Sequence, residues 1–182
     1  MTPITEIITV HAPIERVFAL STNVKLVQQT LGMDLIDTGK ADGVTSGNII
    51  ANSRVHWRGR KFGLMTEHHT LITRFEPPST IELPSGPTKA AFFEDTQESG
   101  RFATFHHDHF FRETLVDGAP QTLLRDEIHY TLPFGILGRI AANLVMTPHI
   151  RMLARTRFAM LKQLAEGEGW REWSDVAGNS AA

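Results

Sequence analysis

The sequence predicts an α+β protein in which a curved antiparallel sheet of about seven strands surrounds a long C-terminal helix. Three observations support this fold class. The N-terminus combines one β-branched segment with two short amphipathic segments. Residues 33–132 alternate runs rich in Ile, Val, Thr, Phe and His with turn signals, and the last third has a helical pattern. No helical pattern separates the central strands, which favours hairpins over parallel crossover connections.

The N-terminal region predicts one strand and two short helices. Residues 4–10 alternate Ile or Val with Thr and Glu, as a half-buried strand does. A helix is predicted after Pro13, because proline is tolerated at the first helical position. Its apolar residues share one side, and they are Ile14, Val17 and Phe18. A second helix is predicted between Asn23, a candidate N-cap, and Gly32, a candidate stop.

About six strands are predicted between residues 33 and 132. The turn signals that separate them are Asp42-Gly43, Ser46-Gly47, Phe62-Gly63, Pro77-Pro78, Ser99-Gly100 and Asp117-Gly118. The segment 84–90 combines proline, serine and glycine, so it is predicted to be a surface loop.

A long helix with a kink is predicted at the C-terminus. Apolar residues recur at helical spacing over residues 136–145 and again over residues 148–165. Pro148 removes one backbone donor, so we expect the helix to kink there. Gly167 ends the pattern. We expect residues 1–173 to form one domain and residues 174–182 to form a flexible tail.

Arg157 interrupts the apolar side of this helix. On a helical wheel it falls near the centre of the apolar arc, where a guanidinium is costly unless it is paired. Two interpretations stay open. Arg157 either reaches the edge of the helix or pairs with a carboxylate of the sheet, or it points into a cavity and meets a polar group of a ligand.

Composition excludes several functional classes. The chain has 182 residues, 18 basic and 20 acidic side chains, a net charge of −2 and no cysteine. Binding of nucleic acid through phosphate neutralisation needs a basic surface, so it is not expected. Without cysteine there is no disulfide, no thiolate nucleophile and no Cys-containing zinc site. We also expect no signal peptide and no integral membrane association, which favours a cytoplasmic location.

The segment from Phe102 to Phe111 carries the most informative side chains. Alternation along a strand places Phe105, His107 and His109 on one face. The preceding strand offers Phe93, Asp95 and Gln97, and the following strand offers Asp126, Ile128 and Tyr130. An aromatic wall with a few convergent polar groups is typical of a small-molecule pocket.

The histidines of this segment allow three interpretations. They can be satisfied polar lining residues, or His107 and His109 can act as an acid–base pair with a carboxylate. They can also ligate a metal if Asp126 or His129 supplies a third ligand. No G-x-S-x-G, G-x-G-x-x-G, Walker or H-E-x-x-H motif is present, so hydrolase triads and nucleotide chemistry are not expected.

The C-terminal region is basic as well as helical. No acidic residue occurs between Ile128 and Ala165, a stretch that contains four arginines and one lysine. Such a helix could be a solvated face balanced by acids elsewhere, or it could contact an anionic membrane surface or a partner.

The order and the motifs of these elements resemble the SRPBCC superfamily, which includes START, Bet v 1-like and polyketide cyclase/dehydrase proteins. The matching segments are Ala12–Phe18, Gly43–Gly47, Val55–Arg58, Phe105–Phe111, Asp126 with Tyr130 and Pro133, and Gly135–Gly138 leading to Arg157. The resemblance covers nearly the whole chain. It implies the helix-grip fold, with a ligand cavity between the sheet and the long helix. The insertion 84–91 departs from the family pattern and is expected at the mouth of that cavity.

The resemblance also implies a function. Members of this superfamily bind lipids, sterols or polyketides, and some catalyse cyclisation or dehydration. We therefore expect binding or transport of a small apolar molecule, without a cofactor or metal. The alternative is a cyclase/dehydratase that uses His107 or His109 with Asp126 or Asp95. The candidate ligand-binding residues are Trp57, Phe93, Gln97, Phe105, His107, His109, Tyr130, Leu144, Arg157 and Phe158. The sequence leaves the oligomeric state open, a homodimer included.

Overall fold

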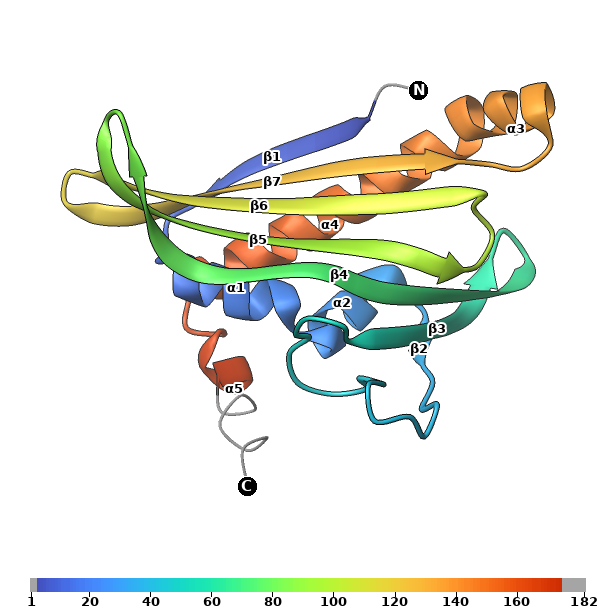
Figure 1. Ribbon diagram of the computed structural model, residues 1–182, viewed down its shortest axis with the longest axis horizontal. Coiled ribbons are helices and arrows are strands. Elements are labelled where there is room, and N and C mark those ends of the chain that lie inside the picture. Colours follow the sequence, from blue (N-terminus) through green and yellow to red (C-terminus); the bar gives the residue numbers. More distant parts are fainter. Residues whose placement is uncertain (1–2, 175–182) are drawn as a thin grey trace.

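A seven-stranded antiparallel sheet forms the body of the protein in a computed structural model that describes residues 3–174. The strands are β1 (Ile4–Val10), β2 (Asp34–Leu35), β3 (Arg54–Lys61), β4 (Leu64–Leu83), β5 (Gly86–Ser99), β6 (Thr104–Val116) and β7 (Ala119–Thr131). Their order across the sheet is β1-β7-β6-β5-β4-β3-β2, so consecutive strands from β2 to β7 are neighbours. Six strands follow residue 33, as predicted, and the helix-grip architecture is confirmed (Figure 1).

The turn signals were right at three hairpins, among them Ser99-Gly100, which leads from β5 to β6, and wrong at Pro77-Pro78. Phe62-Gly63 and Asp117-Gly118 have positive φ at both residues, as two-residue hairpin turns between twisted strands require. Pro77-Pro78, predicted as a turn, instead lies inside β4, where the pairing with β5 is irregular between Glu76 and Ser79. Proline lacks a ladder donor and is tolerated at such a bulge.

The predicted loop over residues 84–90 is also wrong for most of its length. Only Pro84 and Ser85 connect β4 to β5, and Gly86–Ala90 pairs with β4 as strand. The two strands therefore extend as a long hairpin arm, whose tip lies at one end of the sheet (Figure 1).

The two short helices follow the predicted signals. α1 (Ile14–Thr22) buries the residues of its apolar side, and α2 (Val24–Leu31) starts at Asn23. The Asn23 side-chain oxygen accepts hydrogen bonds from the N–H groups of Lys25 and Leu26, at 3.0 and 3.4 Å. Gly32 ends α2 with φ of 58°, a left-handed conformation that glycine adopts without steric cost.

The C-terminal helix is interrupted close to Pro148. α3 (Gly135–Ala141) leads into η1 (Ala142–Met146), a π-helical turn, and then into α4 (Thr147–Glu166). The N–H of Thr147 bonds to the carbonyl of Ala142, one residue further than in an α-helix. A short helix, α5 (Arg171–Ser174), follows and was not predicted. The rest of the predicted tail, residues 175–182, lies outside the described residues.

The inner face of the sheet packs against the helices. α4 crosses behind the strands and contacts β1, α1 and α2 (Figure 1). Its buried residues are Ile150, Ala154, Arg157, Phe158, Leu161 and Ala165, so the predicted apolar arc faces the sheet. Within residues 3–174, no helix has the length and apolar character that crossing a membrane requires.

Candidate functional site

A cavity lies between the inner face of the sheet and helices α2 and α4. Its volume is about 230 Å³. Its aromatic lining residues are Trp57, Phe62, Phe93, Phe102 and Phe105. Aliphatic side chains complete most of the wall, among them Val27 of α2 and Ile150 of α4. The volume is just below the roughly 300–1,000 Å³ typical of drug-sized ligand pockets, so the cavity suits a smaller ligand.

Five polar side chains meet on one wall of this cavity. The register of β5, β6 and β7 aligns Asp95 with His107 and His109 with Asp126. Arg157 reaches the same place from α4, and all five residues line the cavity. The alternation of side chains along β6 places both histidines on the inner face, as predicted. We call these five residues the His–Asp–Arg network.

His109 is at the centre of the network. Its Nδ1 lies 2.7 Å from Oδ1 of Asp126, and its Nε2 lies 3.1 Å from Oδ2 of Asp95. Phe93 stacks on the imidazole with 4.0 Å between the ring centroids. An ionised carboxylate only accepts hydrogen bonds, so two such partners favour the imidazolium form, in which both ring nitrogens donate.

The environment of the network separates the pKa values of its two histidines. Burial opposes the charged form of His109, but Asp126 and Asp95 outweigh burial and raise the pKa of His109 above its usual value. Burial and the neighbouring charge on His109 lower the pKa of His107. Despite burial, His109 and Arg157 hold the pKa of Asp126 well below its usual value. The network therefore favours the charged form of His109 and the neutral form of His107.

Arg157 is paired inside the protein. Its NH1 donates to Oδ2 of Asp126 at 3.0 Å, and its NH2 donates to the carbonyl of Ser21 at 3.2 Å. Arg157 therefore forms the ion pair with a sheet carboxylate that one sequence interpretation anticipated, and it lines the cavity as well. Two carboxylates, one guanidinium and one imidazolium balance in charge, so the network requires no charged ligand for neutrality.

His107 leaves one polar atom without a partner. Its Nε2 is buried and makes no hydrogen bond, although Oδ2 of Asp126 lies 3.2 Å away. Its Nδ1 lies 3.6 Å from Oδ2 of Asp95, beyond hydrogen-bond distance. A buried polar atom without a partner is costly, so His107 offers an unused hydrogen-bonding site inside the cavity.

The structure brings six of the ten predicted ligand-binding residues to the cavity wall. These are Trp57, Phe93, Phe105, His107, His109 and Arg157, and the predicted catalytic alternative Asp126 joins them. The other four do not line it. Gln97 braces the 100–103 loop through bonds to the Phe102 backbone, and Phe158 is buried in the core.

Tyr130 and Leu144 were predicted to bind the ligand, but both lie outside the cavity wall. The Tyr130 hydroxyl bonds to the carbonyl of Ala142 and to Oγ1 of Thr147, so it holds η1. Leu144 is 73% exposed on η1. The helical pattern placed Leu144 on the apolar face, but the π-helical turn changes the angular position of the residues around it.

The sequence analysis missed a polar set at one end of the cavity. His68 on β4 lines the wall, and Lys61, Arg101 and His149 lie near the β3–β4 turn. Phe62, at that turn, is 54% exposed, so this end of the cavity reaches the protein surface. The signal that could have found His68 is its alternation with Thr66 and Thr70, two buried residues of the inner face.

Segment 84–91 is not at the cavity mouth. None of its residues line the cavity, and the β4–β5 hairpin lies at the opposite end of the sheet from the β3–β4 turn (Figure 1). The expectation from the insertion was wrong because the residues extend two paired strands instead of forming a loop.

Comparison with solved structures identifies the fold. A START superfamily protein from Mycobacterium smegmatis superposes with a TM-score of 0.58 at 13% identity, over 90% of this chain and 99% of that one. The chain has the helix-grip fold. The di-domain ARO/CYC protein BexL from the BE-7585A biosynthetic pathway has a TM-score of 0.54 at 12% identity, over 91% of this chain and 50% of that one.

A third helix-grip structure is truncated norcoclaurine synthase from Thalictrum flavum. It has a TM-score of 0.50 at 10% identity, over 92% of this chain and 98% of that one. No family model matches the sequence. A search of curated proteins also finds no match. At these identities the likeness concerns the helix-grip fold, and function has to be argued from the site.

Proposed function

We propose that this helix-grip protein binds a small, largely apolar molecule with one polar group in the cavity between the sheet and α4. The observation that supports this proposal most directly is an apolar cavity with the His–Asp–Arg network on one wall. A ligand that loses roughly 200 Å² of apolar surface there would gain about 5 kcal/mol from burial. The volume favours a medium-chain lipid or a molecule with one or two rings over a full sterol.

The polar group of the ligand would bond to His107. Nε2 of His107 is the buried network atom that lacks a partner, whereas both nitrogens of His109 and the guanidinium of Arg157 are engaged. Neutral imidazole can donate or accept one hydrogen bond, so a hydroxyl, carbonyl or protonated acid would suit it. Phe105 and Trp57 would contact the apolar part of the ligand.

A cavity-filling variant tests binding. Ala154 lies on α4, lines the cavity and is 6% exposed, so Ala154→Phe places a ring where the ligand would lie. Ala159→Phe adds the same ring on the exposed side of the same helix and is the matched control. Medium-chain fatty acids, the corresponding alcohols and small aromatic ketones would be screened by thermal shift.

A ligand present at about one hundred times its dissociation constant adds about 2.7 kcal/mol of stability, or roughly 5–10 °C in Tm. We expect such a shift for the wild type and for Ala159→Phe, and none for folded Ala154→Phe. Equal shifts in the two variants, or no shift of the wild type with any compound, would refute binding in this cavity.

A second candidate function is proton transfer on a bound carbonyl compound. It is favoured by the proximity of His107 and His109, whose pKa values shift in opposite directions, because opposite pKa shifts in one site are typical of an acid–base pair. Nε2 of His107 would take a proton from the carbon next to a carbonyl. The names of two structural neighbours, an ARO/CYC protein and a synthase, are consistent with chemistry in this fold.

Deuterium exchange separates the two functions. A small aromatic β-diketone in deuterated buffer would exchange its acidic C–H hydrogens faster with the wild type than with buffer alone, if His107 acts as a base. His107→Asn should abolish this acceleration, because the amide is not a base, and still bind the compound in the thermal shift assay, because the amide keeps a hydrogen-bonding group. If the wild-type protein binds the compound but exchange proceeds only at the rate in buffer, the protein is a binder and the proton-transfer function is refuted.

A further inference from the structure

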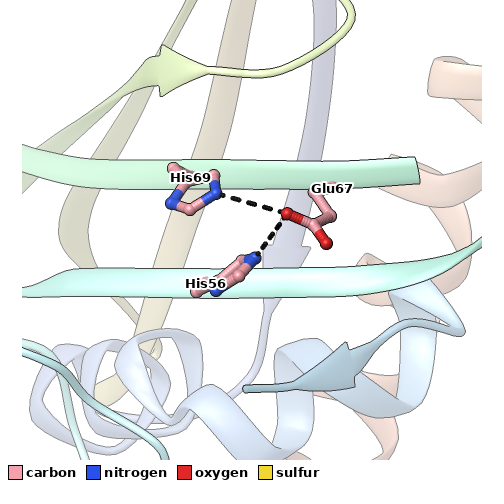
Figure 2. A group of neighbouring side chains, drawn as sticks. All are labelled: His56, Glu67 and His69. Atoms are coloured by element: carbon pink, nitrogen blue, oxygen red, sulfur yellow. Dashed lines mark ion pairs between the residues drawn. The ribbon is translucent and has the colours of Figure 1, made fainter. Parts of the chain in front are cut away.

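A second group of histidines and a carboxylate lies on the outer face of the sheet, on two of the strands that border the cavity. The group consists of His56 on β3 with Glu67 and His69 on β4 (Figure 2). His56 and His69 are direct cross-strand partners, and Glu67 precedes His69 by two residues and so shares its face. The flanking residues Val55 and Trp57 point the other way and line the cavity.

One carboxylate oxygen of Glu67 is directed at both imidazoles. Its Oε2 lies 3.3 Å from Nε2 of His56 and 3.8 Å from Nε2 of His69 (Figure 2). Ligand atoms around a tetrahedral zinc ion, with bonds of about 2.0–2.1 Å, are separated by roughly 3.3 Å. The two distances from Oε2 are therefore already near the spacing that a single ion requires, and ligand atoms of all three residues lie within 4.8 Å of one another.

Two further features of this group favour binding of a cation. Nε2 of His56 is buried and has no hydrogen-bond partner, which leaves an unused lone pair or proton beside the carboxylate. Arg58 donates to the other oxygen of Glu67, Oε1, from Nε at 2.8 Å and from NH2 at 2.7 Å. Such an outer hydrogen bond fixes the orientation of a ligating carboxylate and leaves Oε2 available.

The geometry points to a binding site for a first-row transition-metal dication of the Zn²⁺ type, held by His56, Glu67 and His69. Two imidazoles and one carboxylate suit zinc and its neighbours better than calcium or magnesium, which prefer oxygen ligands. Three protein ligands leave a fourth position for water. The two rings stack at 3.9 Å, so each must turn about its side-chain bonds until its plane includes the ion.

Other His–carboxylate groups among residues 3–174 fit a metal less well. Asp95, His107 and His109 also contain two imidazoles, but both nitrogens of His109 are bonded to carboxylates and the guanidinium of Arg157 lies 3.1 Å from its Nδ1. A dication there would face that positive charge at contact distance. His129, the other third ligand considered from the sequence, lies on the outer face, away from that pair. The remaining outer-face groups contain one imidazole each.

This site could not be read from sequence spacing. His56 and His69 are thirteen positions apart and match no metal-binding motif, and only the register of the β3–β4 hairpin sets them opposite each other. The expectation that the protein needs no metal followed from the family resemblance, and the absence of cysteine excluded only Cys-containing zinc sites; neither detects cross-strand ligands of this kind.

Metal titration of tag-free, chelator-treated full-length protein tests the proposal. Zn²⁺ binding would be measured by calorimetry and Co²⁺ binding by visible absorption. Glu67→Gln and His69→Gln change half-exposed side chains and should leave the metal-free Tm close to that of the wild type. His106→Gln, on the same face, and His107→Asn, in the cavity, are the controls.

We expect one Zn²⁺ per chain. Loss of an outer-shell partner costs about 10–100-fold in affinity, so loss of a ligand should weaken binding by at least about 100-fold. Both controls should retain the affinity of the wild type. No Zn²⁺ or Co²⁺ binding by the wild type would overturn the proposal. Wild-type affinity in both Glu67→Gln and His69→Gln, or loss of binding in His107→Asn, would overturn it as well.

Discussion

At the scale of single residues, His107 and His109 lie beside the same two carboxylates and yet have opposite pKa shifts, because burial and the neighbouring His109 outweigh the carboxylates only at His107. The pKa of His107 is lowered from the usual value of about 6.5, so below pH 6.5 the unfolded chain takes up a proton that the folded chain does not. His107 therefore lowers the free energy of unfolding as pH falls through that window. The pKa of His109 is raised, so His109 stabilises the folded state below about pH 6.5, and this contribution is lost as pH rises through its folded pKa.

Replacing His107 should change how the free energy of unfolding depends on pH. We expect His107→Asn to become more stable relative to the wild type as pH falls from about 7.5 to about 5, because the variant has no imidazole to protonate on unfolding. Urea denaturation at several pH values measures the difference in free energy of unfolding. His129→Asn, on the exposed outer face, is the matched control for the same chemical change. A difference that does not vary with pH would contradict the assignment of a neutral His107.

The residues of the network were only partly predictable, for a physical reason. Strand alternation suffices to place His107 and His109 on one face, and helical periodicity suffices to locate Arg157 on the buried arc. The pairing of Arg157 with Asp126 depends on how α4 crosses the sheet, which no local pattern specifies. The unpaired nitrogen of His107 depends on distances below 4 Å, which follow from packing alone.

At the scale of elements, the side chain of Tyr130 links the sheet to the irregular first part of the C-terminal helix. The Tyr130 hydroxyl lies 3.1 Å from the carbonyl of Ala142 and 2.7 Å from Oγ1 of Thr147. This carbonyl accepts the long bond of the π-helical turn, and Pro148, two residues after η1 ends, offers no N–H. Tyr130 thus ties β7 to the irregular turn from which α4 starts.

Tyr130→Phe separates this role from ligand binding. The substitution removes the hydroxyl and keeps the ring, so we expect a loss of about 1 kcal/mol in the free energy of unfolding, the usual net value of a hydrogen bond. Because Tyr130 does not line the cavity, the dissociation constant of any compound that shifts the wild-type Tm should be unchanged. Denaturant unfolding and calorimetric titration measure the two quantities. A weaker affinity for the compound at an unchanged free energy of unfolding would show that Tyr130 contributes to ligand binding instead.

Element prediction succeeded where local chemistry decides the conformation and failed where pairing overrides it. Asn23 and Gly32 set the ends of α2 through their own hydrogen bonds and backbone angles. Residues 84–90 have the composition of a loop, but Gly86–Ala90 pairs with β4 and so becomes part of the sheet. A proline pair at 77–78 is likewise accommodated at a pairing irregularity in β4.

At the scale of the whole molecule, the sheet and α4 enclose the cavity from two sides and leave one end accessible. The β3–β4 turn approaches the start of α4 there, with 5.0 Å between the ring centroids of Phe62 and His149. Both residues line the cavity, and Phe62 is half-exposed. The two side chains therefore lie across the route by which a ligand would enter, on elements that are far apart in the sequence.

Joining these two positions should slow exchange of a ligand without abolishing binding. The chain has no cysteine, so Phe62→Cys combined with His149→Cys can be linked by a short bismaleimide without side reactions at other thiols. A restricted entrance raises the barrier for entry and exit alike, so we expect both rate constants for an anilinonaphthalene fluorescent probe to fall by the same factor, with little change in Kd. Stopped-flow fluorescence on the linked and unlinked double variant measures these rates, and each single cysteine variant treated with the reagent controls for its bulk. Unchanged rates in the linked protein would mean that the ligand enters by another route. That route would not pass between β5, β6 and β7, because these strands are hydrogen-bonded to one another and cannot separate without breaking the sheet.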